Sequence, residues 1–441
     1  MTDSVPSRPQ DAPRDQASDA SLVDSPKAAR RLAASFAAAT LGSAPMYVLP
    51  VALPAVQPDF GVGRGETAFA YMLLMAGLGA GGYLCGRWSD RLGVARVLVL
   101  GGMGTLAGYL LSAAAPSLAL FALAHCLLLG FLGMGSTFGP LMADTTLWWQ
   151  KRRGVAVAIV ASGNFLAGVI WPPIVQAGIE AFGWRTALGS LGIVCGLGMM
   201  VLSLGVRLRP PSLEASMSPG EALASRGQPA SERPFGMSPN AAQWLLFVAA
   251  VGCCVAMAMP QVHIVAYCAD LGFGAARGAE MLSLMLGFGV VSRLASGWIS
   301  DQIGGMRTLL LGAALQAVAL ALFLPFDSLG SLYVISALFG FFQGGIFPAY
   351  AIIVREHFPA DQAAARTGAV LVGGQVGMAL GGWASGKLFD VFGSYDAAFI
   401  HGLAWNALNL AIVVYLLWRI RPGRRLIRGK PSLNASGAVI G

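Results

Sequence analysis

The chain has 441 residues, of which 56% are apolar and only 11% are charged, and its mean hydropathy is +0.66. Soluble domains carry about a quarter charged residues, whereas about 20 consecutive apolar residues are enough for one bilayer-spanning helix. These values exclude a soluble enzyme, a nucleic-acid-binding protein and a secreted disulfide-rich domain, although the pI is near 9.4. They predict a polytopic membrane protein.

The chain begins with a segment rich in Ser, Asp, Pro and Ala, so we expect residues 1–30 to form a disordered cytoplasmic tail rather than a cleaved leader. Twelve long apolar runs without two-residue alternation follow, and they predict transmembrane helices rather than a barrel. The runs are 32–57, 67–86, 94–114, 117–142, 153–176, 185–207, 241–267, 279–299, 306–326, 330–353, 366–387 and 397–419.

A polar segment, 208–240, divides the runs into two bundles of six helices, 31–207 and 241–420, and we expect it to be a cytoplasmic linker. A basic cytoplasmic tail, 421–441, follows the last run. Most of the 29 Lys and Arg residues lie in the two tails or in the alternate loops that share a membrane side with the tails. The positive-inside rule therefore predicts a multi-pass protein of the cell (inner) membrane with both termini in the cytoplasm.

The two halves share landmarks at a nearly constant offset. Asp59-Phe60-Gly61 recurs 211 residues later as Asp270-Leu271-Gly272, and Glu180-Ala181-Phe182-Gly183 recurs 210 residues later as Asp390-Val391-Phe392-Gly393. The residues Gly86, Asp90, Gly93 and Arg96 recur, at 211, as Gly297, Asp301, Gly304 and Arg307, and Ser162-Gly163-Asn164 recurs as Gly373-Gly374-Gln375. This repeat predicts a duplicated bundle whose halves rock about a central site.

The segment Gly86-Arg87-Trp88-Ser89-Asp90-Arg91-Leu92-Gly93, followed by Arg96, resembles the loop 2–3 signature of the major facilitator superfamily. Gly297-Trp298-Ile299-Ser300-Asp301, with Gly304 and Arg307, resembles it more weakly. The resemblance covers about 31–420. It implies an all-α membrane protein with 12 transmembrane helices in two pseudo-symmetric six-helix bundles, and secondary transport by alternating access.

The same residues suggest a gate. Glycines allow helices to approach closely, and an Asp at a helix end can accept hydrogen bonds from a neighbouring helix N-terminus. Such contacts exist in one state only, so they would act as a latch. By pseudo-symmetry we expect Arg366 to pair with Asp90, and Lys151, Arg152 or Arg153 to pair with Asp301. The alternative is a short loop whose charges, including Arg91, only set the topology.

Arg293 is the one charged residue deep inside a run, about 12 Å from the cytoplasmic end at 1.5 Å per residue. Burying it costs about 2.5–3.5 kcal/mol on insertion scales. We expect no Asp or Glu inside the runs to neutralise it, whereas an anionic ligand could, because guanidinium binds a carboxylate bidentately. The alternative is a side chain that snorkels to the membrane interface.

Four further polar side chains fall at similar depth, namely Tyr47, Asn164, Gln343 and Gln375. They are candidates for reading the polar atoms of a small acid, although interhelical amides also serve as packing contacts. His125 and His263 lie nearer the outer side, where histidine could couple proton movement to transport or act only in packing. The cysteines Cys85, Cys126, Cys195, Cys253, Cys254 and Cys268 show no metal or disulfide spacing, and we expect no cofactor and no metal.

Within the superfamily the chain resembles the bacterial monocarboxylate-porter and oxalate/formate-antiporter branch. Trp148-Trp149-Gln150-Lys151-Arg152-Arg153-Gly154 and the position of Arg293 before Gly297 carry this resemblance. It implies that Arg293 binds a substrate carboxylate. Animal monocarboxylate carriers have an acid where this chain has Gly289, and their acidic helix 1 signature is replaced by Ser43-Ala44-Pro45-Met46-Tyr47.

The resulting prediction is a transporter, and not an enzyme, that moves a small organic anion by proton symport or anion exchange. The alternative is an exporter of drugs or hydrophobic metabolites on the same scaffold. No Walker sequence and no nucleophile–base motif is present in the sequence. We expect a monomer that contacts membrane lipids, uses protons if it is a symporter, and binds no nucleic acid.

Overall fold

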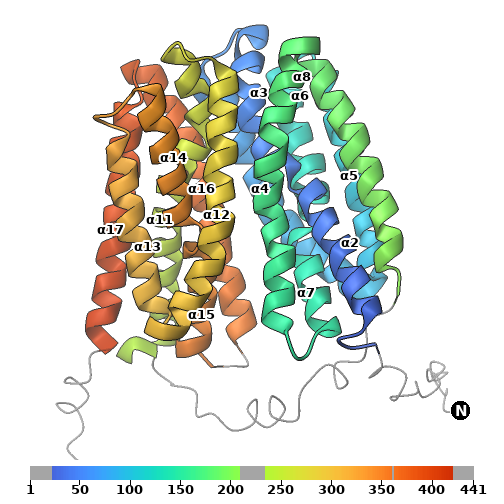
Figure 1. Cartoon of the computed structure of the whole chain (residues 1–441), viewed down its shortest axis with the longest axis vertical. Coiled ribbons are helices and arrows are strands. Elements are labelled where there is room, and N and C mark those ends of the chain that lie inside the picture. Colours follow the sequence, from blue (N-terminus) through green and yellow to red (C-terminus); the bar gives the residue numbers. More distant parts are fainter. Residues whose placement is uncertain (1–21, 209–233, 360–361, 421–441) are drawn as a thin grey trace, which may run out of the picture.

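The computed structural model describes residues 22–208, 234–359 and 362–420, and within these ranges every regular element is helical. The helices form two bundles that stand side by side, one from each half of the chain (Figure 1). This arrangement agrees with the predicted fold class.

The N-terminal half begins with a helix that is broken once and ends with a helix that doubles back. Its elements are α2 (Pro26–Gly42), α3 (Ala44–Phe60), α4 (Arg64–Leu92), α5 (Val94–Ala113), α6 (Leu118–Ala124), the π-helix η1 (His125–Met134), α7 (Phe138–Trp148), α8 (Arg153–Ser203) and the 3-10 turn η2 (Leu204–Val206). The α8 helix reverses at Gly183, whose φ of +79° is outside the helical region.

The C-terminal half repeats this plan. It contains the 3-10 turn η3 (Pro234–Gly236), α11 (Pro239–Asp270), α12 (Ala275–Ile303), α13 (Gly305–Leu322), α14 (Leu329–Gln343), α15 (Ile346–His357), α16 (Ala363–Phe392) and α17 (Asp396–Ile420). In the described ranges, ten helical segments are long and apolar enough to span a membrane. Because α8 reverses at Gly183 and so forms two segments, and α16 is a further long helix, the described chain has the twelve long helical segments that were predicted.

Two predicted boundaries are corrected by helix caps. Helix α2 begins at Pro26, four residues before the expected end of the tail, because the Ser25 side chain accepts a hydrogen bond from the Ala28 backbone N–H. Helix α11 begins at Pro239, where Ser238 caps it in the same way. The expected tails at 1–21 and 421–441 and most of the expected linker, 209–233, lie outside the described residues.

The repeat is visible in the backbone. Gly93 (φ +86°, ψ 149°) joins α4 to α5, and Gly304 (φ +81°, ψ 159°) joins α12 to α13 in the same conformation. The N–H groups of these two glycines donate to Ser89 O and Ser300 O at 2.9 and 2.8 Å. Only glycine adopts this conformation readily, which explains why the signature has a glycine at both positions.

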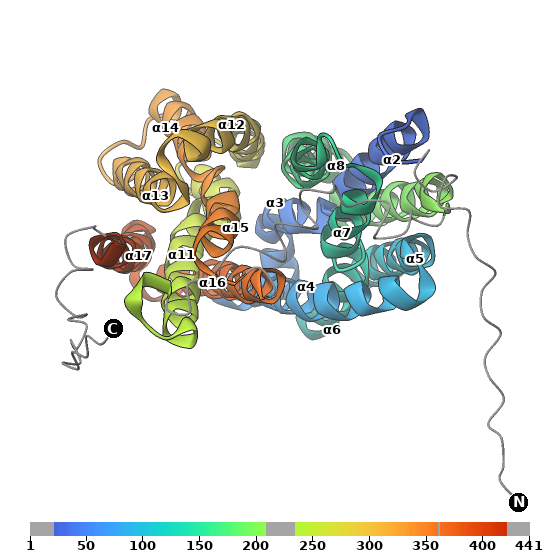
Figure 2. The same cartoon turned by 90° about the horizontal axis from the view of Figure 1, so that it is seen from below.

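Helix α2 starts at the same end of the molecule at which α17 finishes (Figure 1). We call this end the tail end and the opposite end the far end. Seen along the bundles, α4 lies beside α16 and α8 lies beside α12, so these four helices form most of the contact between the halves, and α3 packs against α11 as well (Figure 2). The hydrogen bonds between described residues that join the halves lie between the far end and the level of Arg293.

Candidate functional site

Arg293 bridges the two halves. Its helix, α12, belongs to the C-terminal half, and its Nη1 donates to Ala161 O of α8 in the N-terminal half at 3.2 Å. Its Nε lies 3.5 Å from Gly344 O, a carbonyl at the break between α14 and α15. Each described hydrogen-bond partner of this guanidinium is therefore an uncharged main-chain carbonyl.

An aromatic ring supports the guanidinium. The Arg293 Cζ atom lies 4.2 Å from the centre of the Phe165 ring of α8, within the range of a cation–π contact. Gly289, one turn earlier on α12, makes room for that ring, because a Cβ there would lie 2.5 Å from Phe165 Cε1. Any side chain at position 289, including the acid of the animal carriers, would therefore collide with the Phe165 ring in this conformation.

Tyr47 and Asn164, two predicted site residues, are joined. The Tyr47 hydroxyl donates to Asn164 Oδ1 at 2.5 Å, and Asn164 Nδ2 donates to Ser43 Oγ at 3.4 Å. Ser43 lies at the break between α2 and α3, so the break brings a polar group into the helix packing. Tyr47 is buried, and its partner Asn164 directly precedes Phe165, whose ring lies against the Arg293 guanidinium.

The predicted glutamines have unused hydrogen-bonding atoms. Gln343 precedes the α14–α15 break and accepts from Gln261 Nε2 of α11 at 3.2 Å, but its own Nε2 is buried and has no hydrogen-bond partner among the described residues. Gln375 Oε1 is likewise buried, and no residue in the described part of the chain bonds to it. Buried polar atoms in native proteins are nearly always satisfied, so both are suited to water or ligand. Gln261 was not predicted; its position after Pro260 was the available signal.

The expectation that no acid lies inside the runs is wrong for Glu280, which belongs to the run 279–299, and a second acid, Asp144, lies in a helix just beyond the predicted end of the run 117–142. Helix α7 continues to Trp148, so Asp144 is within it, and both its oxygens accept from Arg31 at 2.7 Å in a buried pair. Glu280 lies in α12 near the far end, bonded to Arg277 and Tyr333. Neither is bonded to Arg293.

The two predicted histidines lie apart. His125, in η1, uses its Nδ1 to donate to Phe121 O at 2.8 Å, and its described contacts stay within the N-terminal half. His263, in α11, donates through Nε2 to Gly382 O at 2.7 Å, while its Nδ1 lies 3.5 Å from the Tyr395 hydroxyl. The structure thus places His263 with the far-end residues rather than beside Arg293.

The signature residues surround a cavity of about 1010 Å³ at the tail end of the N-terminal half. Gly86, Asp90, Arg91, Gly93 and Arg96 line it, together with the Arg31–Asp144 pair and Arg207. A Cβ on Gly86, or on its repeat mate Gly297, would meet no atom within 4 Å. The close helix approach expected at these glycines is therefore absent from this conformation.

The expected latch pairs are not formed here. Arg366 is bonded to Gln362 Oε1 and Pro239 O, and no described residue forms a hydrogen bond or an ion pair with Asp90 or Asp301. In the C-terminal half Glu356 of α15 accepts from the Gly305 N–H at the start of α13, where Arg307 lies. The pairings remain predictions for a state with the tail end closed.

The far end holds an ion-pair cluster that sequence reasoning missed. Arg64, at the start of α4, donates to both oxygens of Asp270 at the end of α11, and to the Tyr395 hydroxyl at 2.7 Å. Burial raises the pKa of Tyr395, which lies in the turn before α17, well above its usual range. The sequence predicted no role for Arg64; the repeat landmark containing Asp270 was the available signal.

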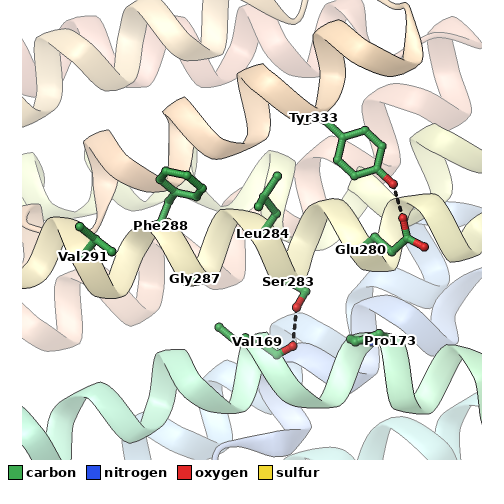
Figure 3. Close-up of a pocket in the computed structure, with 9 residues that line it drawn as sticks. All are labelled: Val169, Pro173, Glu280, Ser283, Leu284, Gly287, Phe288, Val291 and Tyr333. Carbon is green, nitrogen blue, oxygen red and sulfur yellow. Dashed lines mark hydrogen bonds between the residues drawn. The ribbon is translucent and has the colours of Figure 1, made fainter.

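A groove of about 530 Å³ lies between α8, α12 and α14, but its polar atoms are already used (Figure 3). The Ser283 hydroxyl donates to Val169 O, and Glu280 accepts from Tyr333 (Figure 3). The exposed side chains of Phe288 and Val291 line the rest. In the described ranges no three His, Cys, Asp or Glu side chains gather as a metal site requires.

Comparisons with known proteins identify the family of the chain from its sequence and match its fold to solved structures. The family model described as "Major Facilitator Superfamily" matches residues 35–335 and 281–439. Monocarboxylate transporter 13 of Rattus norvegicus is 30% identical over 330 residues, which cover 74% of each chain. Monocarboxylate transporter 11 of Mus musculus is 30% identical over 272 residues, covering 61% of this chain and 58% of that one. A crystal structure of the peptide transporter POT in complex with sulfate has a TM-score of 0.70 at 15% identity and covers 92% of this chain and 97% of that chain.

Proposed function

Since the chain belongs to the Major Facilitator Superfamily, we propose that it is a secondary transporter of a small organic anion, a mono- or dicarboxylate, that works by alternating access between its halves. The observation that carries this proposal is Arg293. It is a guanidinium at the contact between the halves, supported by Phe165 and bonded, among described residues, to main-chain carbonyls.

A carboxylate is the ligand that this arrangement favours. Guanidinium holds a carboxylate through two parallel N–H···O bonds, and in a membrane interior an unneutralised charge is costly. Carbonyl groups solvate the cation without cancelling its charge, so an anionic ligand gains more there than a neutral one. The names of the relatives, monocarboxylate transporters, support the same ligand class.

Groups around Arg293 would select among anions. The Tyr47–Asn164 pair offers polar atoms from the N-terminal half, and the unpartnered Nε2 of Gln343 offers a donor from the C-terminal half. Ligand contacts from both halves would favour a state in which the halves close around the substrate. We keep the bacterial monocarboxylate-porter and oxalate/formate-antiporter branch as part of the proposal, with transport as proton symport or as anion exchange.

The tail end is assigned to the cytoplasm of the cell membrane by the positive-inside rule. With that orientation, the conformation described above is joined across its halves on the outer side and at the level of Arg293. Asp90 and Asp301 would then find their partners when the cytoplasmic side closes. This makes the signature loops the inner gate of the transport cycle.

The test is uptake of radiolabelled mono- and dicarboxylates into proteoliposomes by the intact chain and by Arg293→Gln. We expect saturable uptake that Arg293→Gln reduces at least tenfold, because bidentate charge-assisted bonds are lost. Arg277→Gln is the matched control, since Arg277 is an exposed arginine on the same helix. Size-exclusion profiles and thermal midpoints show whether each variant is folded. Equal uptake by folded Arg293→Gln would reject the anion site and favour the exporter of hydrophobic compounds.

A further inference from the structure

The two halves do not contribute equally to the far end. Building on the proposed alternating-access function, we propose that the far end is held shut by a one-sided latch, in which the segment Gly63-Arg64-Gly65 of the N-terminal half docks between Asp270, Asp390 and Tyr395 of the C-terminal half. We call this segment the Arg64 knob.

The Arg64 side chain makes the first part of the contact. It donates to both carboxylate oxygens of Asp270, donates to the Tyr395 hydroxyl, and lies with its Cζ 3.8 Å from the centre of the Phe389 ring. The Arg64 side chain is 14% exposed and that of Asp270 is 36% exposed. A bidentate pair in this half-buried setting is stronger than a freely exposed pair.

The knob backbone makes the second part. The N–H groups of Arg64 and Gly65, which begin α4, each donate to the Asp390 carboxylate at 2.8 Å. An acid at a helix N-terminus satisfies orphan donors and is favoured by the helix dipole. Here the capping acid comes from the other half of the protein, at the end of α16.

Glycines allow this approach. A Cβ on Gly386 of α16 would lie 2.9 Å from Arg64 O, and a Cβ on Gly65 would lie 2.9 Å from Asp390 Oδ2. The backbones of α4 and α16 therefore meet closely at the knob. Opening of the far end must separate them and break every contact named above.

The repeat mates of the two acids bond within their own half. Asp59, the mate of Asp270, accepts from Arg185 at 2.9 Å. Glu180, the mate of Asp390, accepts from Gln176 of its own helix at 2.9 Å. The mate of Arg185 is Tyr395, and the mate of Arg64 is Ala275, by the offsets of 210 and 211.

The difference between the two halves at the far end follows from these differences in sequence between repeat mates. The C-terminal half has a tyrosine where the N-terminal half has the arginine that neutralises its own acid, so Asp270 takes its cation from across the interface. When the far end opens, Asp270 and the N-terminus of α4 lose their partners, whereas Asp59 and Glu180 keep theirs. The latch therefore biases the protein toward the state with the far end closed.

The experiment measures the distance between the halves at the far end, without substrate. Spin labels are placed on Pro116→Cys and Pro325→Cys, in exposed turns of the two halves, in a chain whose six native cysteines are replaced by alanine. We expect Asp270→Asn to raise the ratio of far-open to far-closed molecules about fivefold relative to that background. Asp59→Asn is the matched control, because it removes the mate's ion pair, and we expect it to change the ratio less than twofold.

A second variant weakens the same contact without changing a charge. Gly386→Ala should shift the ratio in the same direction, since the new Cβ crowds Arg64 O. No shift in folded Asp270→Asn and Gly386→Ala, or an equal shift in Asp59→Asn, would overturn the latch. Because the distances are measured without substrate, a failure of the carboxylate assignment would leave this readout intact, and failure of the latch would leave the uptake test intact.

Discussion

The guanidinium of Arg293 and the ring of Phe165 face each other across the two halves, 4.2 Å from Cζ to ring centre. The ring offers a flat, weakly negative surface that stabilises the cation without neutralising it. A cation stabilised in this way keeps its charge for a ligand. The pair also couples α12 to α8, so a change at Arg293 affects the contact between the halves.

Phe165→Leu tests the contribution of the ring. A cation–π contact in a desolvated site contributes up to about 2 kcal/mol, so we expect the KM for a transported carboxylate to rise about threefold to tenfold. The maximal rate should change less, since Arg293 remains. Uptake at varied substrate concentration in proteoliposomes measures both, and an unchanged KM would show that the ring does not support the binding cation.

Gly289→Ala tests the space beneath the ring. The new Cβ would lie 2.5 Å from Phe165 Cε1, so the ring must move away from Arg293. We expect carboxylate affinity to fall by an amount similar to that in Phe165→Leu, and the double variant to show little additional loss. Additive effects in the two single variants would contradict this coupling.

The buried Arg31–Asp144 pair should matter for stability more than for substrate binding. Removing one partner leaves an unpaired buried charge, which typically costs about 3–5 kcal/mol. We therefore expect Arg31→Ala to lower the thermal midpoint in detergent clearly. Arg185→Ala is the comparison, because its pair with Asp59 has side chains that are each 42% exposed and should contribute about 1 kcal/mol or less. A similar loss in both variants would contradict the role of burial.

The glycines of the signature separate into two kinds. Gly93→Ala and Gly304→Ala place a side chain at φ above +80°, which costs about 1–3 kcal/mol and should lower the thermal midpoint. Gly86→Ala and Gly297→Ala meet no atom within 4 Å, so we expect the folded state to keep its stability. If helices approach these two positions when the tail end closes, the same variants slow transport. Full activity in both would favour a loop that only sets topology.

The fold could be predicted because the features that specify it can be read directly from the order of residues. Apolar runs, turn glycines and the 211-residue repeat lie in the sequence itself, and Arg293 was conspicuous because few charges occur inside such runs. The polar pairs Tyr47–Asn164 and Gln261–Gln343 depend on helix rotation, which hydropathy does not specify. The misplaced end of the fourth run hid Asp144, since three polar residues after position 143 resemble a loop.

The far-end cluster could not have been derived from spacing. Arg64 and Asp270 are 206 residues apart, and each lies at a helix end where the sequence shows only a turn. Which half supplies the cation depends on how the halves meet, and that is a property of tertiary packing. The repeat predicted equivalent positions, but it did not predict that equivalent acids would take partners from different halves.

The fourth and tenth crossings are both interrupted near their centres, at Gly135 after η1 and at Gly344 after α14, positions that correspond in the repeat to within two residues. Beyond each interruption lies a short helix, α7 of 11 residues or α15 of 12 residues, that runs to the tail end. Each half thus contains a break in one crossing at an equivalent position. In the proposed transport cycle, closure of the tail end by bending at these two breaks would require less tilting of each whole bundle as a rigid block.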